Sequence, residues 1–365
     1  MLRFREWLCE RMCKDMPVRP PCGHRCDIEI CLSYNWLSES LNWETLFPIW
    51  RAYNLNWVLL VAGSRNMRPN GAGNPVSETR LAQLVEHVGL LEDNGFNIVL
   101  RVGQPNYDEH YTYHWDDEIP LNGTTITWPE RAQEAVEAVV DACPNVRYFQ
   151  IENEPQYEWF WDSWNSATWV AFNQHLKNEV DYIRAANPAN KIISPGLTSP
   201  EGDDDEQQKE MVNFFEKWMR KLFNTGADLP FDILAFHLWP WAHTLPKYYN
   251  RYRQKERGIG NRVETLREIM TEYGFDADEI WVTECGKRIG RDDGGFENMK
   301  SPTDQQNFFI DVVADLRQSE ATNVFWWEYK GIYGAATSPL IFNDTGPNPV
   351  YQTFIDYCAK YNQRT

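Results

Sequence analysis

The chain has 365 residues, of which 42% are hydrophobic and 24% charged, and its formal net charge at pH 7 is −18. This length is enough for one large barrel or two ordinary domains, with a substantial core. The acidic charge balance argues against nucleic acid and anionic membrane surfaces as partners, because both are negatively charged and would repel the protein.

Aromatic residues make up 14% of the chain, and 17 residues are Trp. Flat apolar rings fill large cores, and they also pack against the C–H faces of sugars. We expect core packing to account for at least half of these rings. No apolar run approaches the ~20 residues that span a bilayer, and the first residues lack the apolar segment of a secretory signal. We expect no membrane segment, and the choice between secretion and the cytoplasm stays open.

Residues 1–26 are basic and rich in Pro and Cys, which predicts a short extension before the first strand. Five of the eight Cys lie in the first 31 residues: Cys9, Cys13, Cys22, Cys26 and Cys31. Two disulfides, a zinc site with His24 or free thiols are all compatible with this spacing. The remaining cysteines, Cys143, Cys285 and Cys358, are expected to be small buried residues.

From there, apolar strand-like segments alternate with segments of helical periodicity. Residues 78–93 show the helical pattern most clearly, with apolar side chains on one face. The expected strands are 28–33, 57–62, 97–102, 146–154, 191–194, 231–237, 279–284 and 323–327. The expected helices are 44–53, 78–93, 129–141, 168–186, 207–223, 262–273, 303–317 and 350–361.

Eight such alternations, with continuously apolar strands, predict a parallel sheet closed as a (β/α)8 TIM barrel. The alternative is an open doubly wound sheet, which would usually carry a Gly-rich phosphate loop after an early strand. Gly71-Ala72-Gly73 lies in a long loop and opens no helix. We therefore expect one barrel domain over residues 27–365, preceded by the Cys-rich extension 1–26.

Chemically unusual residues fall at the carboxyl ends of the expected strands, where TIM barrels carry their active sites. The fourth strand runs into Asn153-Glu154-Pro155, the sixth ends at His237 and the seventh ends at Glu284. A carboxylate at the rim of a buried strand is costly unless it has a partner or a task. Two such carboxylates predict the proton donor and the nucleophile or base that glycosidic bond cleavage needs.

These strand ends resemble clan A retaining β-glycoside hydrolases, such as families 5 and 39. Ile151-Glu152-Asn153-Glu154-Pro155 resembles their Asn-Glu-Pro signature, and residues 281–286 resemble their nucleophile strand. Residues 325–330 are similar to their eighth strand. The resemblance implies that Glu154 is the acid/base, Glu284 the nucleophile, Asn153 a donor to the sugar 2-hydroxyl and Trp327 the floor of the −1 subsite.

The resemblance also implies a double-displacement hydrolase that acts on an oligo- or polysaccharide, and we expect endo action. Three features depart from the clan. Strand one offers only Ser33, Tyr34, Asn35 and Trp36, which could line the pocket but match no clan motif. The clan's strand-two Arg is missing, which leaves Arg65 or Arg101 as substitutes, and Trp239 stands where the clan often has Tyr after the strand-six His. The remaining expected substrate-binding residues are Trp36, Tyr157, Trp161 and His237. Glu152 is interpreted as a buried support on the same strand face as Glu154, paired with Arg101.

Other interpretations stay open. Glu154 and Glu284 could be structural ion-pair partners of Arg101 or Lys287, and His237 could be a core histidine. The main alternative function is a carbohydrate-binding barrel without catalysis. No metal or cofactor is expected, because the sequence contains neither a His-x-His strand end nor a His-Glu-x-x-His motif. The oligomeric state cannot be predicted.

Overall fold

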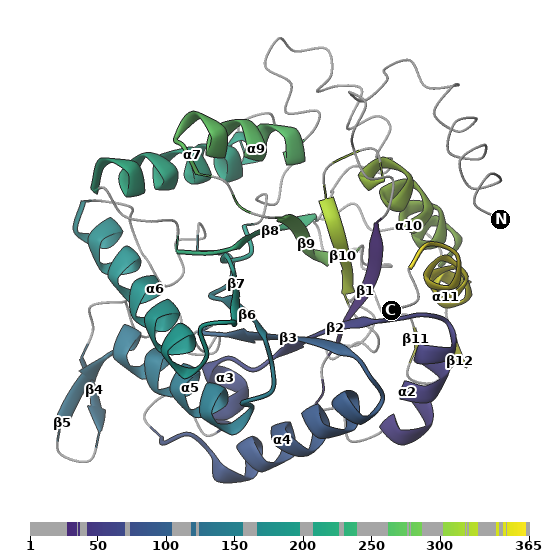
Figure 1. The fold of residues 1–365 in the computed structure, drawn as a ribbon, viewed down its shortest axis with the longest axis horizontal. Coiled ribbons are helices and arrows are strands. Elements are labelled where there is room, and N and C mark those ends of the chain that lie inside the picture. Colours follow the sequence, from purple (N-terminus) through teal and green to yellow (C-terminus); the bar gives the residue numbers. More distant parts are fainter. Residues whose placement is uncertain are drawn as a thin grey trace, which may run out of the picture.

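Eight parallel strands close into a barrel that is surrounded by helices (Figure 1). The arrangement confirms the predicted (β/α)8 fold. The computed structural model describes residues 28–34, 36, 42–69, 74–103, 118–121, 124–155, 166–197, 207–225, 230–238, 262–275, 277, 279–286, 302–317, 319, 321–327, 341–342, 346–347 and 349–362. The expected extension 1–26 lies outside these residues.

Each barrel strand falls on a predicted segment. The strands are β1 (Glu29–Tyr34), β2 (Trp57–Val61), β3 (Asn97–Val102), β6 (Tyr148–Ile151), β7 (Lys191–Ile193), β8 (Ile233–Leu238), β9 (Glu279–Cys285) and β10 (Ala321–Trp327). They pair in the order β1-β10-β9-β8-β7-β6-β3-β2, and the pairing of β1 with both β10 and β2 closes the ring. The carboxyl ends of all eight strands therefore meet at one mouth of the barrel.

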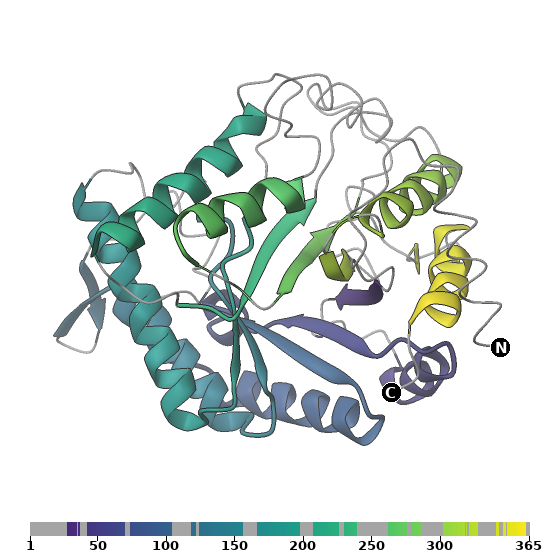
Figure 2. The same ribbon diagram turned by 45° about the horizontal axis from the view of Figure 1, so that its top comes forward.

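The helices form the outer layer, as Figure 2 shows from a second direction. The predicted ones are α2 (Trp43–Ala52), α4 (Glu78–Asp93), α5 (Trp128–Ala142), α6 (Ser166–Ala186), α7 (Gln207–Thr225), α9 (Arg262–Glu272), α10 (Pro302–Leu316) and α11 (Pro349–Tyr361). Five short elements were not predicted: α3 (Ser64–Met67), the hairpin of β4 (Glu118–Leu121) with β5 (Thr124–Thr127), and the pair β11 (Ile341–Phe342) and β12 (Gly346–Pro347). Within the described part of the chain, no helix combines the length and apolar character needed to cross a membrane.

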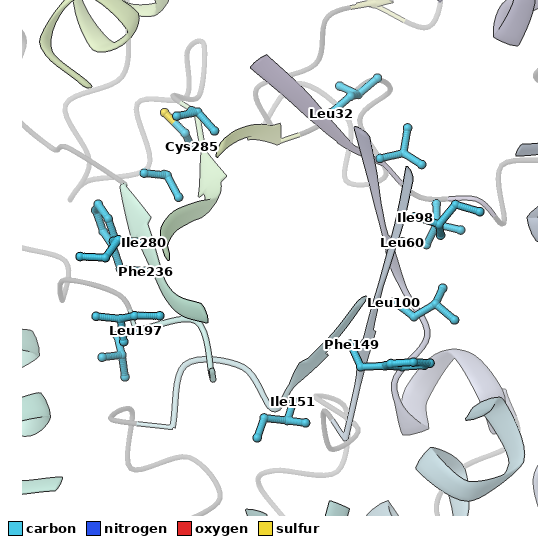
Figure 3. Packing of buried hydrophobic residues seen from close by; sticks show 14 of the residues in the cluster. Leu32, Leu60, Ile98, Leu100, Phe149, Ile151, Leu197, Phe236, Ile280 and Cys285 are labelled. Carbon is cyan, nitrogen blue, oxygen red and sulfur yellow. The ribbon is translucent and has the colours of Figure 1, made fainter. Parts of the chain in front are cut away.

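Both faces of the barrel strands are buried, which explains their continuously apolar sequences. One set of side chains fills the interior of the barrel: Cys31, Leu59, Val99, Ile193, Ile233, Ala235, Trp281 and Phe325. The other set packs beneath the helices, and Figure 3 shows labelled members such as Leu60, Leu100 and Phe149 directed away from the ring of strands. A filled interior leaves the mouth as the place for polar side chains.

Tryptophan and cysteine behave largely as core residues here. Trp50, Trp218, Trp281 and Trp326 are fully buried, as expected for part of the Trp content. Cys143, Cys285 and Cys358 are buried free thiols, which confirms their predicted role, and burial raises the pKa of Cys143 to about 12. Cys31 is also a buried free thiol inside the barrel, so it takes no part in the disulfides considered above.

Candidate active site

The backbone after β6 turns Glu154 into the mouth of the barrel. Glu152 and Glu154 both have positive φ, at 56° and 48°, a conformation that residues other than Gly rarely adopt. The Glu154 amide donates to the Gly196 carbonyl at 2.9 Å. Its carboxylate oxygen Oε1 lies 2.6 Å from His237 Nδ1, at the end of β8. The predicted catalytic acid therefore meets the predicted histidine.

Glu152 is buried, as predicted, but the same turn changes its face and its partner. Strict alternation would put Glu152 on the face of Glu154, but the positive φ values end the alternation, and Glu152 contacts α6 instead. Its Oε1 lies 2.8 Å from His175 Nε2. Its predicted pairing with Arg101 is therefore wrong, because the Arg101 side chain contacts Gln150 and Glu284.

A β-bulge in β9 directs Glu284 inward. Phe236 pairs with Val282, yet the next residue, His237, pairs with Glu284, so Thr283 is an extra residue in β9. Gln150, inside the barrel, donates from Nε2 to Thr283 Oγ1 at 3.2 Å. Thr283 and Glu284 thus both face inward although they are consecutive. Bulges next to active sites commonly re-aim a side chain in this way.

His237 lies between the two carboxylates. Its Nδ1 is 2.6 Å from Glu154 and 3.5 Å from Glu284 Oε2. The ring is fully buried, whereas the side chains of Glu154 and Glu284 are 14% and 9% exposed. Gly196 permits this packing, since a Cβ there would lie 2.1 Å from His237 Nε2. The carboxylates can therefore meet a substrate from solvent, while the imidazole is held from behind.

Arg101, from β3, is one of the two residues that the sequence offered as substitutes for the clan's strand-two Arg, and it lies at the carboxylates. Its guanidinium contacts Glu284 Oε1, and its Nε donates to Gln150 Oε1 at 3.0 Å. Such a charge-assisted hydrogen bond orients a carboxylate more strongly than a neutral donor does. The Arg101 Cζ also lies 6.0 Å from the centre of the Trp327 ring. The other candidate, Arg65, belongs to α3, and its side chain lies outside the described residues.

The remaining predicted site residues fall into three groups. Asn153 forms an isolated backbone bridge with Gly196, next to Glu154. Trp36 is 4% exposed and donates from its indole to the Val61 carbonyl at 2.9 Å, within the outer core. This contact fits packing better than binding of a sugar. Tyr157, Trp161 and Trp239 lie outside the described residues.

Sequence reasoning missed the layer of Gln150 and Thr283 beneath the carboxylates. The polar Gln150 within an apolar strand was the available signal. Two trios of the described residues place carboxylate and imidazole atoms within 4.8 Å of one another, as metal sites do: Glu154 with His237 and Glu284, and Glu152 with His175 and Glu179. Hydrogen-bonded acid pairs have the same spacing, so the distances alone do not indicate a metal ion.

Residues 110–354, more than half of the chain, match the family model described as the glycosyl hydrolase catalytic core. The chain belongs to this family. It is therefore a glycoside hydrolase, and carbohydrate is its substrate class. No curated protein matches the sequence.

Solved structures share the fold of this glycoside hydrolase. One is a family 39 glycoside hydrolase from the gut symbiont Bacteroides cellulosilyticus WH2, with 14% identity and a TM-score of 0.56 over 92% of this chain and 64% of that one. Another is a broad specificity endoglucanase from Clostridium acetobutylicum, with 10% identity and a TM-score of 0.56 over 92% and 97%. A third is xylanase 10B from Thermotoga petrophila RKU-1, with 14% identity and a TM-score of 0.54 over 93% and 96%. Family and fold agree with the resemblance to clan A.

Proposed function

We propose that this enzyme hydrolyses β-glycosidic bonds with retention of anomeric configuration, with Glu154 as acid/base and Glu284 as nucleophile. One observation carries the proposal: oxygens of the two carboxylates lie within 4.8 Å of each other. Retaining enzymes hold their carboxyl groups ~5–5.5 Å apart, whereas inverting enzymes leave ~6.5–9.5 Å for a water molecule. The short separation supports direct attack by Glu284.

The reaction then proceeds in two steps. Glu284 attacks the anomeric carbon while Glu154 transfers its proton to the glycosidic oxygen, which releases the leaving alcohol and forms a glycosyl-enzyme ester. Glu154 next removes a proton from water, and the water oxygen attacks the same carbon and releases Glu284. The contact with Arg101 orients the Glu284 carboxylate for attack.

We further propose a polysaccharide substrate and endo action. Trp327 is the last residue of β10, lies beside Arg101 and is only partly buried, which suits its ring to meet a sugar face. Asn153 is the chain neighbour of Glu154, and His237 contacts both carboxylates from behind the mouth. Two structures with this fold are named as an endoglucanase and a xylanase, which supports a polymeric substrate.

Hydrolysis of a panel of β-linked polysaccharides, with product sizes and the anomeric configuration followed by NMR, tests the proposal. We expect mid-length products and an initial β-anomer. An initial α-anomer would contradict retention, and release of single sugars from the outset would contradict endo action.

The role of Glu154 is tested by Glu154→Gln on aryl β-glycosides of the sugar found in that panel. We expect kcat/KM to fall by about 10²–10⁴-fold for a phenyl glycoside, because phenolate leaves only with proton donation. A 2,4-dinitrophenyl glycoside should lose far less. Glu86→Gln, on the exposed face of α4, is the control. Equal losses on both substrates would contradict the acid role.

A further inference from the structure

A second carboxylate–histidine cluster lies directly behind the active site, between β6 and α6. Glu152 Oε1 is 2.8 Å from His175 Nε2, and Glu179 Oε1 is 3.3 Å from the same nitrogen. All three side chains are at most 2% exposed. His175 and Glu179 stand four residues apart on α6, so they lie on one face of that helix. The reaction described above uses none of these groups.

Burial dictates the charge of this cluster. Two ionised carboxylates away from water would be strongly unfavourable without a compensating positive charge or proton. Burial raises the pKa of Glu179 to about 8, partly opposed by His175 and assisted by Glu152. Burial would lower the pKa of His175, but its attraction to Glu179 and Glu152 outweighs this, so the pKa is raised overall. Near neutral pH the cluster therefore contains a neutral Glu179, and its two carboxyl groups favour the protonated form of His175.

The cluster is connected to both strand ends that supply active-site groups. Glu152 is two residues before Glu154, and the two carry the positive φ values of this turn. On the other side, the Glu179 carboxylate lies against Gly103, where an added Cβ would be 2.3 Å from Oε1. Gly103 follows β3 two residues after Arg101. A displacement of the cluster would therefore move the backbone at both Glu154 and Arg101.

We propose that Glu152, His175 and Glu179 form a buried brace that shares protons and positions Glu154 and Arg101 for the reaction. The contact between Glu152 and His175 ties the left-handed turn after β6 to α6, and this turn directs Glu154 into the mouth. The catalytic part of this proposal rests on the proposed function, whereas the structural part does not.

The structural part is tested by crystal structures of His175→Leu and Glu152→Gln, the second of which keeps the side-chain shape. We expect the contact of 2.6 Å between Glu154 and His237 to lengthen by about 1 Å or more in both variants. Val180→Ala, also buried on α6, is the control for packing loss and should leave the contact in place. An unchanged contact in Glu152→Gln would overturn the proposal, even if His175→Leu failed to fold.

The catalytic part is tested with the phenyl and 2,4-dinitrophenyl glycosides. A displaced acid penalises only the poor leaving group, so kcat/KM of Glu152→Gln should fall at least about tenfold more for phenyl than for dinitrophenyl. His175→Gln, which retains a donor, should recover part of the loss in His175→Leu. Equal losses on both substrates, as expected for Val180→Ala, would overturn positioning. If the wild type cleaves no glycoside, the proposed function fails, while the crystal structures still decide the brace.

Proton sharing is tested by thermal unfolding of Glu179→Gln and wild type between pH 5 and 8. The raised pKa of Glu179 gives stability that is complete below about pH 4.5 and is lost as pH rises towards 8. Gln does not titrate, so the Tm of the variant relative to wild type should rise by roughly 5 °C across this range. A difference independent of pH, or a stoichiometric divalent cation found by elemental analysis and absent from Glu179→Gln, would overturn proton sharing.

Discussion

Two regions of the barrel contain the same chemical set, two carboxylates around one imidazole, yet they differ in surroundings. In the mouth, His237 lies 2.6 Å from Glu154 and 3.5 Å from Glu284. Behind it, His175 lies 2.8 Å from Glu152 and 3.3 Å from Glu179. The distances are nearly equal. The mouth carboxylates reach solvent and one of them contacts Arg101, whereas the rear carboxylates are buried.

Solvent exposure determines which role a carboxylate can take in each of the two clusters. A carboxylate at a solvated rim can change its protonation and partners during a reaction, because water and substrate replace what it loses. A buried carboxylate must be compensated within the protein, which suits it to hold backbone in place. The comparison therefore predicts loss of chemistry from changes in the mouth and loss of stability or alignment from changes behind it.

The largest effect is expected for Glu284→Ala. Removal of the nucleophile should lower kcat by at least about 10⁴-fold, since the groups that remain cannot form the glycosyl-enzyme. Steady-state hydrolysis of the 2,4-dinitrophenyl glycoside measures this loss. Added azide should restore turnover and yield a glycosyl azide of inverted configuration. Residual activity close to wild type would show that Glu284 is not the nucleophile. It would also contradict the expected contrast between the mouth and the cluster behind it.

A smaller effect is expected for Arg101→Lys. The Arg101 guanidinium contacts Glu284 and Gln150 at the same time. Lys keeps the positive charge but lacks the planar guanidinium that can bond to both residues. One lost charged hydrogen bond is worth about 1.5–3 kcal/mol, so kcat/KM should fall about 10–100-fold. Arg220→Lys, on the exposed face of α7, provides a matched control. Equal activity in both variants would show that orientation of Glu284 does not depend on the planar guanidinium.

The smallest effect is expected for two glycines of similar backbone conformation. Gly274 (φ +73°) has open space where a methyl group would be added, whereas a methyl group on Gly103 (φ +77°) would strike Glu179. Gly274→Ala should cost about 1–2 kcal/mol of unfolding free energy from strain alone. Gly103→Ala should cost about 2–4 kcal/mol, because overpacking is added. Denaturant unfolding measures both, and equal costs would argue against tight packing behind the active site.

Sequence pattern predicted most of the fold and the convergence of Glu154, His237 and Glu284 at one mouth. Continuous apolar strands such as β3 are detectable because burial on both faces demands apolar residues at every position. Glu154, His237 and Glu284 were identifiable because parallel strands deliver their carboxyl ends to one mouth. Short elements without strong periodicity, such as α3 and the β4–β5 hairpin, escaped prediction.

The sequence by itself determined the barrel and the residues available at its mouth, because hydrophobic periodicity and strand-end chemistry are local properties of the chain. The family followed from the resemblance of the strand-end motifs. Only the tertiary structure decided where those side chains point. The bulge at Thr283 and the turn at Glu152 depend on the register of neighbouring strands and on contacts with α6. A shift of one residue reverses the face of a side chain, so strict alternation misplaced Glu152, while the folded register put Glu154 and Glu284 together.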